Sequence, residues 1–151
     1  MKKVFRFTSL FLLAALVSAC GQTAPVPDLN PVSNIPVYYG DWTIQSVVAS
    51  TPISAPADES MIGMKATYSK EKAALDQNEI VNPEYKEQEM TNDDFFNQYR
   101  NQLSDIGISS DTVQTVEIRN WTNAGNFMMI KDDQTMIFLW DGSYYEMKRD
   151  E

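Results

Sequence analysis

The strongest constraint on the fold is a series of short apolar runs, each closed by turn residues, that extends from residue 40 to the end of the chain. Several of these runs alternate apolar and polar residues with the period of a β-strand. The clearest turn is Asp141-Gly142, a favoured two-residue hairpin turn between Thr135–Trp140 and Ser143–Arg149. The sequence therefore predicts successive antiparallel hairpins.

The expected strands are separated by loops rich in Gly, Pro, Asn and Asp. Successive hairpins of this kind bury one face of the sheet and curl, because closure removes exposed edges. We therefore expect a mostly β domain of about eight strands, a small antiparallel meander that closes into a barrel. The strand-like runs are Trp42–Val48, Ile62–Tyr68, Lys72–Leu75, Glu79–Val81, Tyr85–Met90, Val113–Trp121, Phe127–Lys131, Thr135–Trp140 and Ser143–Arg149.

One packed helix is expected between the strands. Thr91 is a good N-cap, and Asp94 at the third helical position resembles a capping box. Gly107 suits the C-terminal stop. Because the large apolar residues recur at helical spacing, we expect them to pack into the core and not to form a cofactor site. These residues are Phe95, Phe96, Tyr99, Leu103 and Ile106.

The first nineteen residues have the pattern of a signal peptide. Three basic residues precede the apolar run Leu10–Val17, and the small residues Ser18 and Ala19 follow it. The run is shorter than the about 20 apolar residues that a permanent transmembrane helix needs. We therefore expect residues 1–19 to be removed on export.

The segment Val17-Ser18-Ala19-Cys20 resembles the lipobox of bacterial lipoproteins. In that family the cysteine receives a lipid and becomes the first residue of the mature protein. The resemblance implies a lipidated Cys20 that attaches the chain to a membrane of the cell envelope. Cys20 is the only cysteine, so it has no disulfide partner within the chain. Because Gly21 and not Asp follows it, the outer membrane is favoured if the organism has two membranes.

The segment after Cys20 is rich in proline, glutamine, asparagine and serine and has no apolar period. This composition predicts a flexible Pro-rich tether over residues 20–39, able to hold a domain up to about 50 Å from the bilayer. Residues 40–151 then suffice for one domain with a core of its own and are too few for two.

The composition excludes several chemistries. The chain has 21 acidic and 12 basic residues, a formal net charge of −9, and loss of residues 1–19 would make it more negative. Such a surface repels nucleic acid and favours cationic partners. The absence of histidine removes Ser-His-Asp triads and His-zinc sites. With no visible pair of nucleophile and base, we expect no catalytic residue, no bound metal, no cofactor and no enzymatic activity.

The triplet Gly40-Asp41-Trp42 resembles the G-x-W signature of lipocalins. In that family a basic side chain from the late barrel packs across the tryptophan and closes the end of the barrel. The resemblance assigns these roles to Trp42 and Arg149. A second lipocalin motif is not evident, and the helix lies in mid-chain. The segments from Ile62-Gly63 to Trp140–Lys148 also resemble a set of uncharacterised bacterial secreted lipoproteins.

Two non-enzymatic functions remain open at this stage. In the first, the barrel mouth takes a small apolar ligand. In the second, the domain binds a protein, for instance as an inhibitor of a cationic lysozyme-like enzyme, and loop acids such as Asp132 and Asp133 meet the partner. An open interior would favour the first function, and a filled interior would favour the second. Small barrels are often filled by their own side chains. The candidate ligand-lining residues are Trp121, Phe127, Met129, Phe138, Trp140 and Tyr144.

Overall fold

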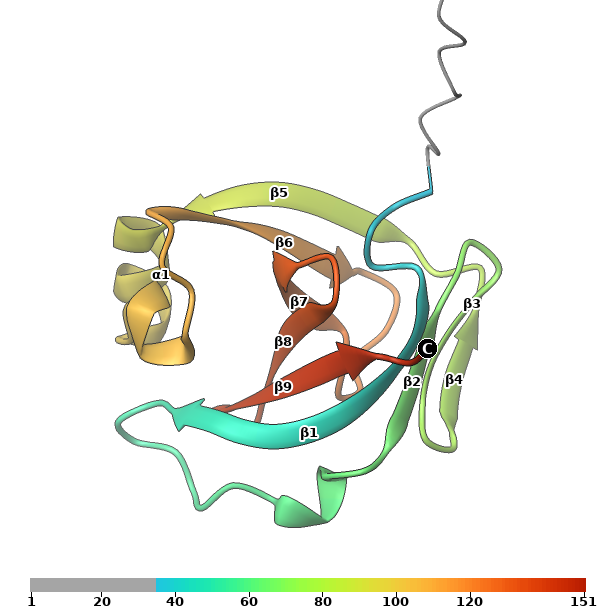
Figure 1. The fold of residues 1–151 in the computed structure, drawn as a ribbon, viewed down its shortest axis with the longest axis horizontal. Coiled ribbons are helices and arrows are strands. Elements are labelled where there is room, and N and C mark those ends of the chain that lie inside the picture. The colour runs from blue at the N-terminus through green and yellow to red at the C-terminus, as the bar shows by residue number, and fades with distance from the viewer. Residues whose placement is uncertain (1–34) are drawn as a thin grey trace, which may run out of the picture. The chain divides into compact units, whose positions relative to one another are not determined.

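The computed structural model describes residues 35–151, and the expected signal peptide, Cys20 and most of the expected tether lie outside these residues. The described chain is mostly β, as predicted, with nine strands where about eight were expected (Figure 1). The strands are β1 (Gly40–Ser50), β2 (Lys65–Tyr68), β3 (Lys72–Leu75), β4 (Asn78–Val81), β5 (Tyr85–Thr91), β6 (Thr112–Ile118), β7 (Phe127–Asp132), β8 (Thr135–Trp140) and β9 (Ser143–Arg149). The helices are α1 (Asn92–Tyr99) and the short 3₁₀ helices η1 (Glu59–Met61) and η2 (Leu103–Ile106).

The strands form one antiparallel sheet in the order β4-β3-β2-β1-β9-β8-β7-β6-β5. Two meanders, β1 to β4 and β5 to β9, therefore meet where β1 pairs with β9. The β1–β9 register shifts between Ile44 and Ser46 and again between Val47 and Ala49. Such irregularities bend and twist a strand. The long, bent β1 helps the sheet to curl into a half-barrel (Figure 1).

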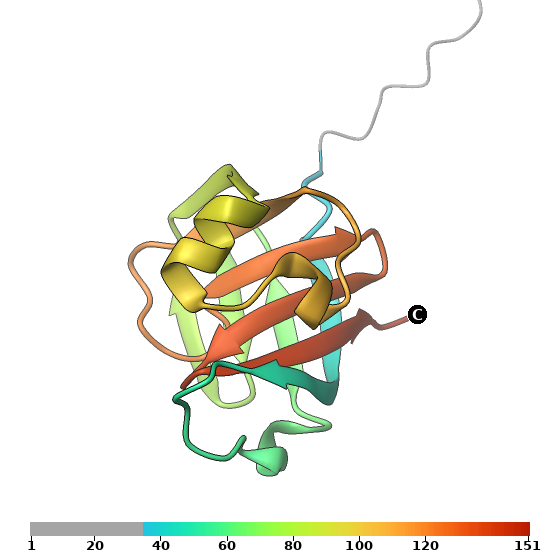
Figure 2. The same cartoon turned by 90° about the vertical axis from the view of Figure 1, so that its left-hand side faces the viewer.

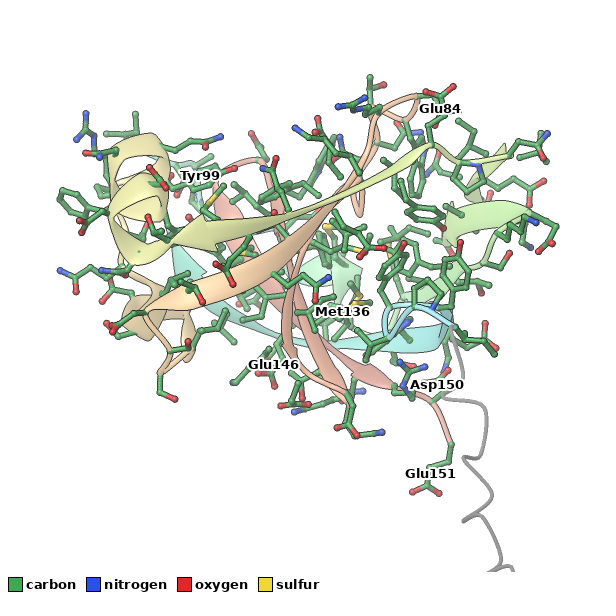
Figure 3. All side chains as sticks on the ribbon, turned by 90° about the horizontal axis from the view of Figure 1, so that it is seen from above. Glu84, Tyr99, Met136, Glu146, Asp150 and Glu151 are labelled. Atoms are coloured by element: carbon green, nitrogen blue, oxygen red, sulfur yellow. The ribbon has the colours of Figure 1, made fainter. Side chains whose placement is uncertain are left out.

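The two edge strands are joined by a short connection, residues 82–84. The chain between Val81 and Tyr85 can span at most about 15 Å, so the two edges of the sheet approach each other at this corner. Within residues 35–151, β4 and β5 do not pair with each other. Glu84 lies in this connection, at the end of β5 away from Tyr99 and the helix (Figure 3). The half-barrel is therefore closed at this corner by a connection and not by a strand pair.

The central strands are buried on both faces. Met136, Ile137 and Phe138 in β8 are each 0% exposed, although successive side chains of a strand point to opposite faces. Met136 and Phe138 belong to a core with Trp42, whereas Ile137 belongs to a second core with Phe95 of α1. Figure 2 shows α1 and η2 lying across the strands. The expectation of one buried face is wrong for β7 and β8, because the α1–η2 segment covers the second.

The start of α1 agrees with the prediction. Thr91 has an extended backbone, and its Oγ1 accepts a hydrogen bond from the backbone N–H of Asp94 at 3.1 Å. Asp93 and Asp94 place negative charge at the positive end of the helix dipole. Phe95 then enters the core with no exposed surface.

The end of α1 differs from the prediction of a helix that continues to Gly107. Arg100 adopts a left-handed conformation with φ 63°, which stops the helix at Tyr99, and η2 follows as a separate turn. Leu103 and Ile106 are buried as predicted, but Phe96 is 43% exposed. The break changes the direction of the chain, so the predicted aromatic residues do not form one continuous helical face.

The packed domain begins before residue 40, where the tether was expected to end. Tyr38 is 2% exposed and lies in the core around Trp42. Its carbonyl oxygen accepts a hydrogen bond from Trp42 Nε1 at 3.0 Å, and Tyr39 N donates to Pro36 O at 3.0 Å. The folded boundary therefore lies a few residues earlier than predicted, because two tyrosines follow the proline-rich segment directly.

Candidate functional site

The six predicted ligand-lining residues do not share one cavity. Trp121 and Phe138 belong to the core around Trp42. Met129 and Tyr144 are buried in the second core, against which Phe127 packs. Trp140, at the end of β8, is 36% exposed. The alternation of side chains along the strands places these residues on two faces and at one end of the sheet.

The interior of the half-barrel is filled by its own side chains. Trp42, Phe138 and Met147 are 0% exposed and belong to one continuous apolar core with Tyr145. The rings of Phe138 and Tyr145 stack with centroids 5.0 Å apart. Because water reaches none of the surface of Trp42, Phe138 or Met147, no water-sized void lies against them. The centre of the sheet therefore resembles a packed core and not a ligand cavity.

The basic residue that the lipocalin resemblance selected does lie over the tryptophan. The Cζ atom of Arg149 is 4.2 Å from the ring centroid of Trp42, which is cation–π geometry. Arg149 Nη1 donates to Tyr39 O at 2.8 Å, Nη2 donates to Val37 O, and Nε donates to Asp133 O at 3.0 Å. Arg149 thus ties the chain before β1 to the last strand and to the β7–β8 turn, which is a structural role.

A tyrosine cluster lies beside the open edge at β5. The ring centroids of Tyr38, Tyr39 and Tyr85 are 5.0 to 5.5 Å apart. Tyr38 Oη donates to Glu87 Oε1 at 2.8 Å, and Gln114 Nε2 donates to Glu87 Oε2 at 3.0 Å. Burial is the main cause that raises the pKa of Tyr38 well above its ordinary value. The hydrogen bond to Glu87 and the negative charge of Glu87 raise this pKa further. Both oxygens of this carboxylate are engaged within the domain.

The arrangement most suited to binding is the mouth of the half-barrel near Trp140. A hollow of about 220 Å³ has apolar lining from Met61, Met64, Leu75 and Ala124, which are buried or half-buried. Its remaining lining residues are polar, acidic or aromatic: Asp58, Asp76, Asn78, Asn123 and Trp140. The hollow is formed by η1 and the segments around it, the β3–β4 turn, the β6–β7 loop and the end of β8.

A second, smaller hollow of about 80 Å³ is also lined by Trp140 and Asp58. Asp141 and Tyr145 contribute to its walls. Tyr145 Oη accepts a hydrogen bond from the backbone N–H of Asp58 at 2.9 Å. Trp140 and Asp58 are therefore shared by two hollows, and a buried tyrosine fixes the backbone between them.

The carboxylates at this mouth make no ion pair within the described part of the chain. The salt bridges of residues 35–151 involve Lys65, Lys72, Lys131 and Lys148, and none of these reaches Asp58, Asp76 or Asp141. Neither hollow has a lysine or arginine among its lining residues. Hydrogen bonds from the Ser60 side chain and backbone lower the pKa of Asp58, so this carboxyl stays ionised. The mouth is therefore negatively charged.

The loop acids predicted for partner contact lie elsewhere. Asp132 Oδ1 accepts a hydrogen bond from Gln134 N at 2.9 Å, and Asp133 O accepts the bond from Arg149 Nε. Burial opposes ionisation of Asp132, but hydrogen bonds from Gln134 and Thr135 outweigh it, and the pKa of Asp132 is lowered. The Asp132 carboxylate and the Asp133 backbone carbonyl are therefore engaged at the β7–β8 turn. They are separated from Trp140 by the length of β8, about 17 Å.

Sequence reasoning selected Trp140 but missed Asp58, Asp76 and Asp141 as its neighbours. Asp141 was recognised as a turn residue, Asp76 lies between the predicted strands Lys72–Leu75 and Glu79–Val81, and Asp58 lies in a loop of Pro, Ala and Ser. Nothing in the local pattern distinguishes them from ordinary solvated acids. They meet because loops distant in sequence end at the same side of the sheet.

Comparisons of this chain with protein-family models, with curated proteins and with solved structures find no match. Among residues 35–151, no helix is long and apolar enough to span a bilayer. The same residues contain no group of three or more Asp, Glu, His or Cys side chains placed to hold a metal ion.

Proposed function

We propose that the chain is a lipid-anchored envelope lipoprotein whose domain binds a cationic protein and catalyses no reaction. The observation that carries the proposal is the mouth itself, where an exposed tryptophan and carboxylates without ion pairs surround a small hollow above a filled core. Such a surface offers apolar contact and negative charge together. The apolar contact and the negative charge are available to a partner outside the domain and not to a ligand inside it.

The size of the hollows favours a protein partner over a free apolar ligand. Small-molecule pockets generally have volumes of about 300 to 1,000 Å³, whereas the two hollows at the mouth measure about 220 and 80 Å³. The larger hollows of about 350 and 310 Å³ on the domain have no apolar residue among their lining residues, which does not suit an apolar molecule. A ligand in the interior would need to displace Phe138 and its neighbours.

The overall charge supports the same conclusion. The chain carries a formal net charge of −9 with 21 acidic residues. A negative surface accelerates the encounter with a cationic protein and disfavours nucleic acid and anionic membranes. A cationic lysozyme-like enzyme is the partner class that we propose to test first, because an anchored domain on the cell envelope would meet such an enzyme where it acts.

Anchoring at Cys20 rests on the lipobox-like residues 17–20. Replacement of Cys20 by Ser is expected to abolish labelling by a radioactive fatty acid and to move the chain from the membrane fraction to the soluble fraction. The unchanged chain, expressed in the same cells, is the control. A Cys20→Ser chain that still partitions with membranes would contradict this part of the proposal.

Partner binding is tested with the full chain, extracted from membranes in detergent and titrated into a cationic lysozyme. We expect binding at low ionic strength that weakens as the salt concentration rises from about 20 to about 200 mM, because screening shortens the range of the attraction. An acidic protein of similar size serves as the control and is expected not to bind. No binding at low salt would overturn the cationic-protein proposal, and bound lysozyme with full activity would exclude inhibition.

A further inference from the structure

We propose that the mouth receives a lysine or arginine side chain of the partner, with its cationic group over the indole of Trp140 and beside the carboxylates of Asp58 and Asp76. This inference rests on the proposed function and specifies where and how the partner is recognised. The occupant is thus one basic side chain from an extended or looped segment of a cationic protein. Trp140, Asp58, Asp76 and Asp141 together form this mouth site.

Trp140 differs from the other two tryptophans in its exposure to solvent. Trp42 and Trp121 are buried in the core, whereas Trp140 keeps more than a third of its surface exposed at the end of a strand. An indole ring attracts lysine and arginine more strongly than other aromatic rings do. Met61 and Leu75 line the hollow beside it, and they offer apolar contact to the methylene groups of a long basic side chain.

The charge of the mouth is complementary to that of a basic side chain. Trp140 is accompanied in the two hollows by Asp58, Asp76 and Asp141 and by no basic residue. An ionised carboxylate that has no basic residue beside it attracts a cation that enters the hollow. Because the described residues offer no group of acids placed to hold a metal ion, an organic cation suits this site better than a metal does.

Two hydrogen bonds hold the backbone around the mouth in place. Thr51 N donates to Gly142 O at 2.7 Å, and Asp58 N donates to Tyr145 Oη at 2.9 Å. These bonds fix both ends of the loop between β1 and η1 against the β8–β9 hairpin. Figure 1 shows this loop and η1 running beside β1 at one side of the sheet. A site whose backbone is already fixed loses little conformational entropy when a ligand binds.

The mouth site is tested with a basic probe, a tetra-arginine peptide, titrated into the full chain in detergent at low salt. Binding is followed by tryptophan fluorescence and, for variants without Trp140, by calorimetry. Replacement of Trp140 by Leu retains an apolar side chain but removes the aromatic face. We expect this change to weaken peptide binding by about tenfold. A tetra-glutamine peptide is the uncharged control and is expected not to bind.

A matched pair of double variants separates a local site from general charge. Asp58→Asn with Asp76→Asn removes two charges at the mouth, and Asp132→Asn with Asp133→Asn removes two charges at the other end of β8. We expect the Asp58/Asp76 double variant to bind the peptide at least about tenfold more weakly than the unchanged chain. The Asp132/Asp133 double variant should bind it less than about twofold more weakly. Circular dichroism and thermal unfolding verify that each variant remains folded.

The possible outcomes distinguish this inference from the proposed function. Equal losses in the two double variants, full binding by the Trp140→Leu chain, or no peptide binding by the unchanged chain would each overturn the mouth site. If the unchanged chain and the mouth variants bind lysozyme equally well, the proposed function is supported and the mouth site is contradicted. If the peptide binds at the mouth but lysozyme does not bind, the site stands and that partner class is excluded.

Discussion

The guanidinium group of Arg149 lies over the indole of Trp42, with its Cζ atom 4.2 Å from the ring centroid. All three nitrogens of the group donate hydrogen bonds to backbone carbonyls, those of Val37, Tyr39 and Asp133. Gly40 lies beneath the same group with φ 136°, and a Cβ atom there would collide with Arg149 Nη1. A single side chain therefore holds together the segment before β1, the last strand and the β7–β8 turn.

Replacement of Arg149 by Ala is expected to lower the free energy of unfolding by about 3 kcal/mol, because the variant loses the cation–π contact and leaves backbone carbonyls without their charged donor. Urea unfolding of the full chain followed by tryptophan fluorescence measures the change. Arg149→Lys should restore only part of the loss, since one ammonium group cannot reach three carbonyls in the planar geometry of a guanidinium.

The neighbouring Lys148 provides the matched control for this prediction. Its Nζ contacts Thr135 Oγ1 at 2.7 Å and Glu146 Oε1 at 3.5 Å, but it is an exposed side chain. Lys148→Ala is expected to cost less than about 1 kcal/mol. Equal losses at the two positions would show that Arg149 contributes only a surface charge.

Two glycines allow backbone strain to be separated from steric contact. Gly142 has φ 78°, and a Cβ atom there would collide with Ser54 and approach Thr51 Oγ1. Gly63 has φ 90°, but a Cβ atom there would meet nothing within 4 Å. Gly63→Ala should therefore cost about 1 kcal/mol from strain alone, and Gly142→Ala about 1 to 3 kcal/mol more. Thermal unfolding of both variants measures the difference, and similar losses would exclude a tight contact at Gly142.

The C-terminal end of α1 offers a stabilising substitution. Arg100 holds a left-handed backbone with φ 63°, and its N–H donates to Phe96 O at 2.9 Å. Glycine adopts this conformation without the steric cost that a side chain imposes. Arg100→Gly is therefore expected to raise the free energy of unfolding by about 0.5 to 1 kcal/mol. Arg100→Ala, which removes the same charge, should not stabilise; if it does, loss of charge and not relief of strain is the cause.

The strands could be predicted because their signals are local. The hairpin at Asp141-Gly142 lies where the dipeptide indicated, with both residues at positive φ. The N-cap at Thr91 was equally local. The burial of β8 on both faces was missed because it depends on a helical segment distant in sequence. The continuous apolar run of this strand was the one available signal.

The binding surface could be predicted only in part. Trp140 was selected as an aromatic residue near a barrel end, but its acidic neighbours come from other loops. Asp58 is brought to the site by a hydrogen bond to Tyr145, a residue distant in sequence. The fold places such residues together only after the sheet has curled. The spacing of these residues in the sequence therefore does not predict the mouth site.

The buried tyrosines give the stability of the domain a pH dependence with a definite sign. Burial and the neighbouring Glu87 raise the pKa of Tyr38 above its ordinary value of 10.0, and burial raises the pKa of Tyr99 to about 12. The folded domain thus holds these protons more tightly than the unfolded chain does. Stability from this source is fully present below pH 10 and is lost as the pH rises through 10 toward 12 and above. Urea unfolding at several alkaline pH values measures the fall.

Glu87→Gln isolates the part of this effect that arises from the carboxylate. The amide oxygen of Gln can still accept the hydrogen bond from Tyr38 Oη, which lies 2.8 Å from Glu87 Oε1, but the negative charge is gone. Ionisation of Tyr38 in the folded domain then becomes easier. Near the ordinary tyrosine pKa the two chains should lose stability equally, because both folded domains still keep Tyr38 protonated there. At higher pH the variant should lose less stability than the unchanged chain, because its Tyr38 begins to ionise in the folded domain first. At pH 7 the two chains should unfold at similar urea concentrations. An equally steep loss in both chains at the higher pH as well would show that burial alone, without Glu87, keeps Tyr38 protonated.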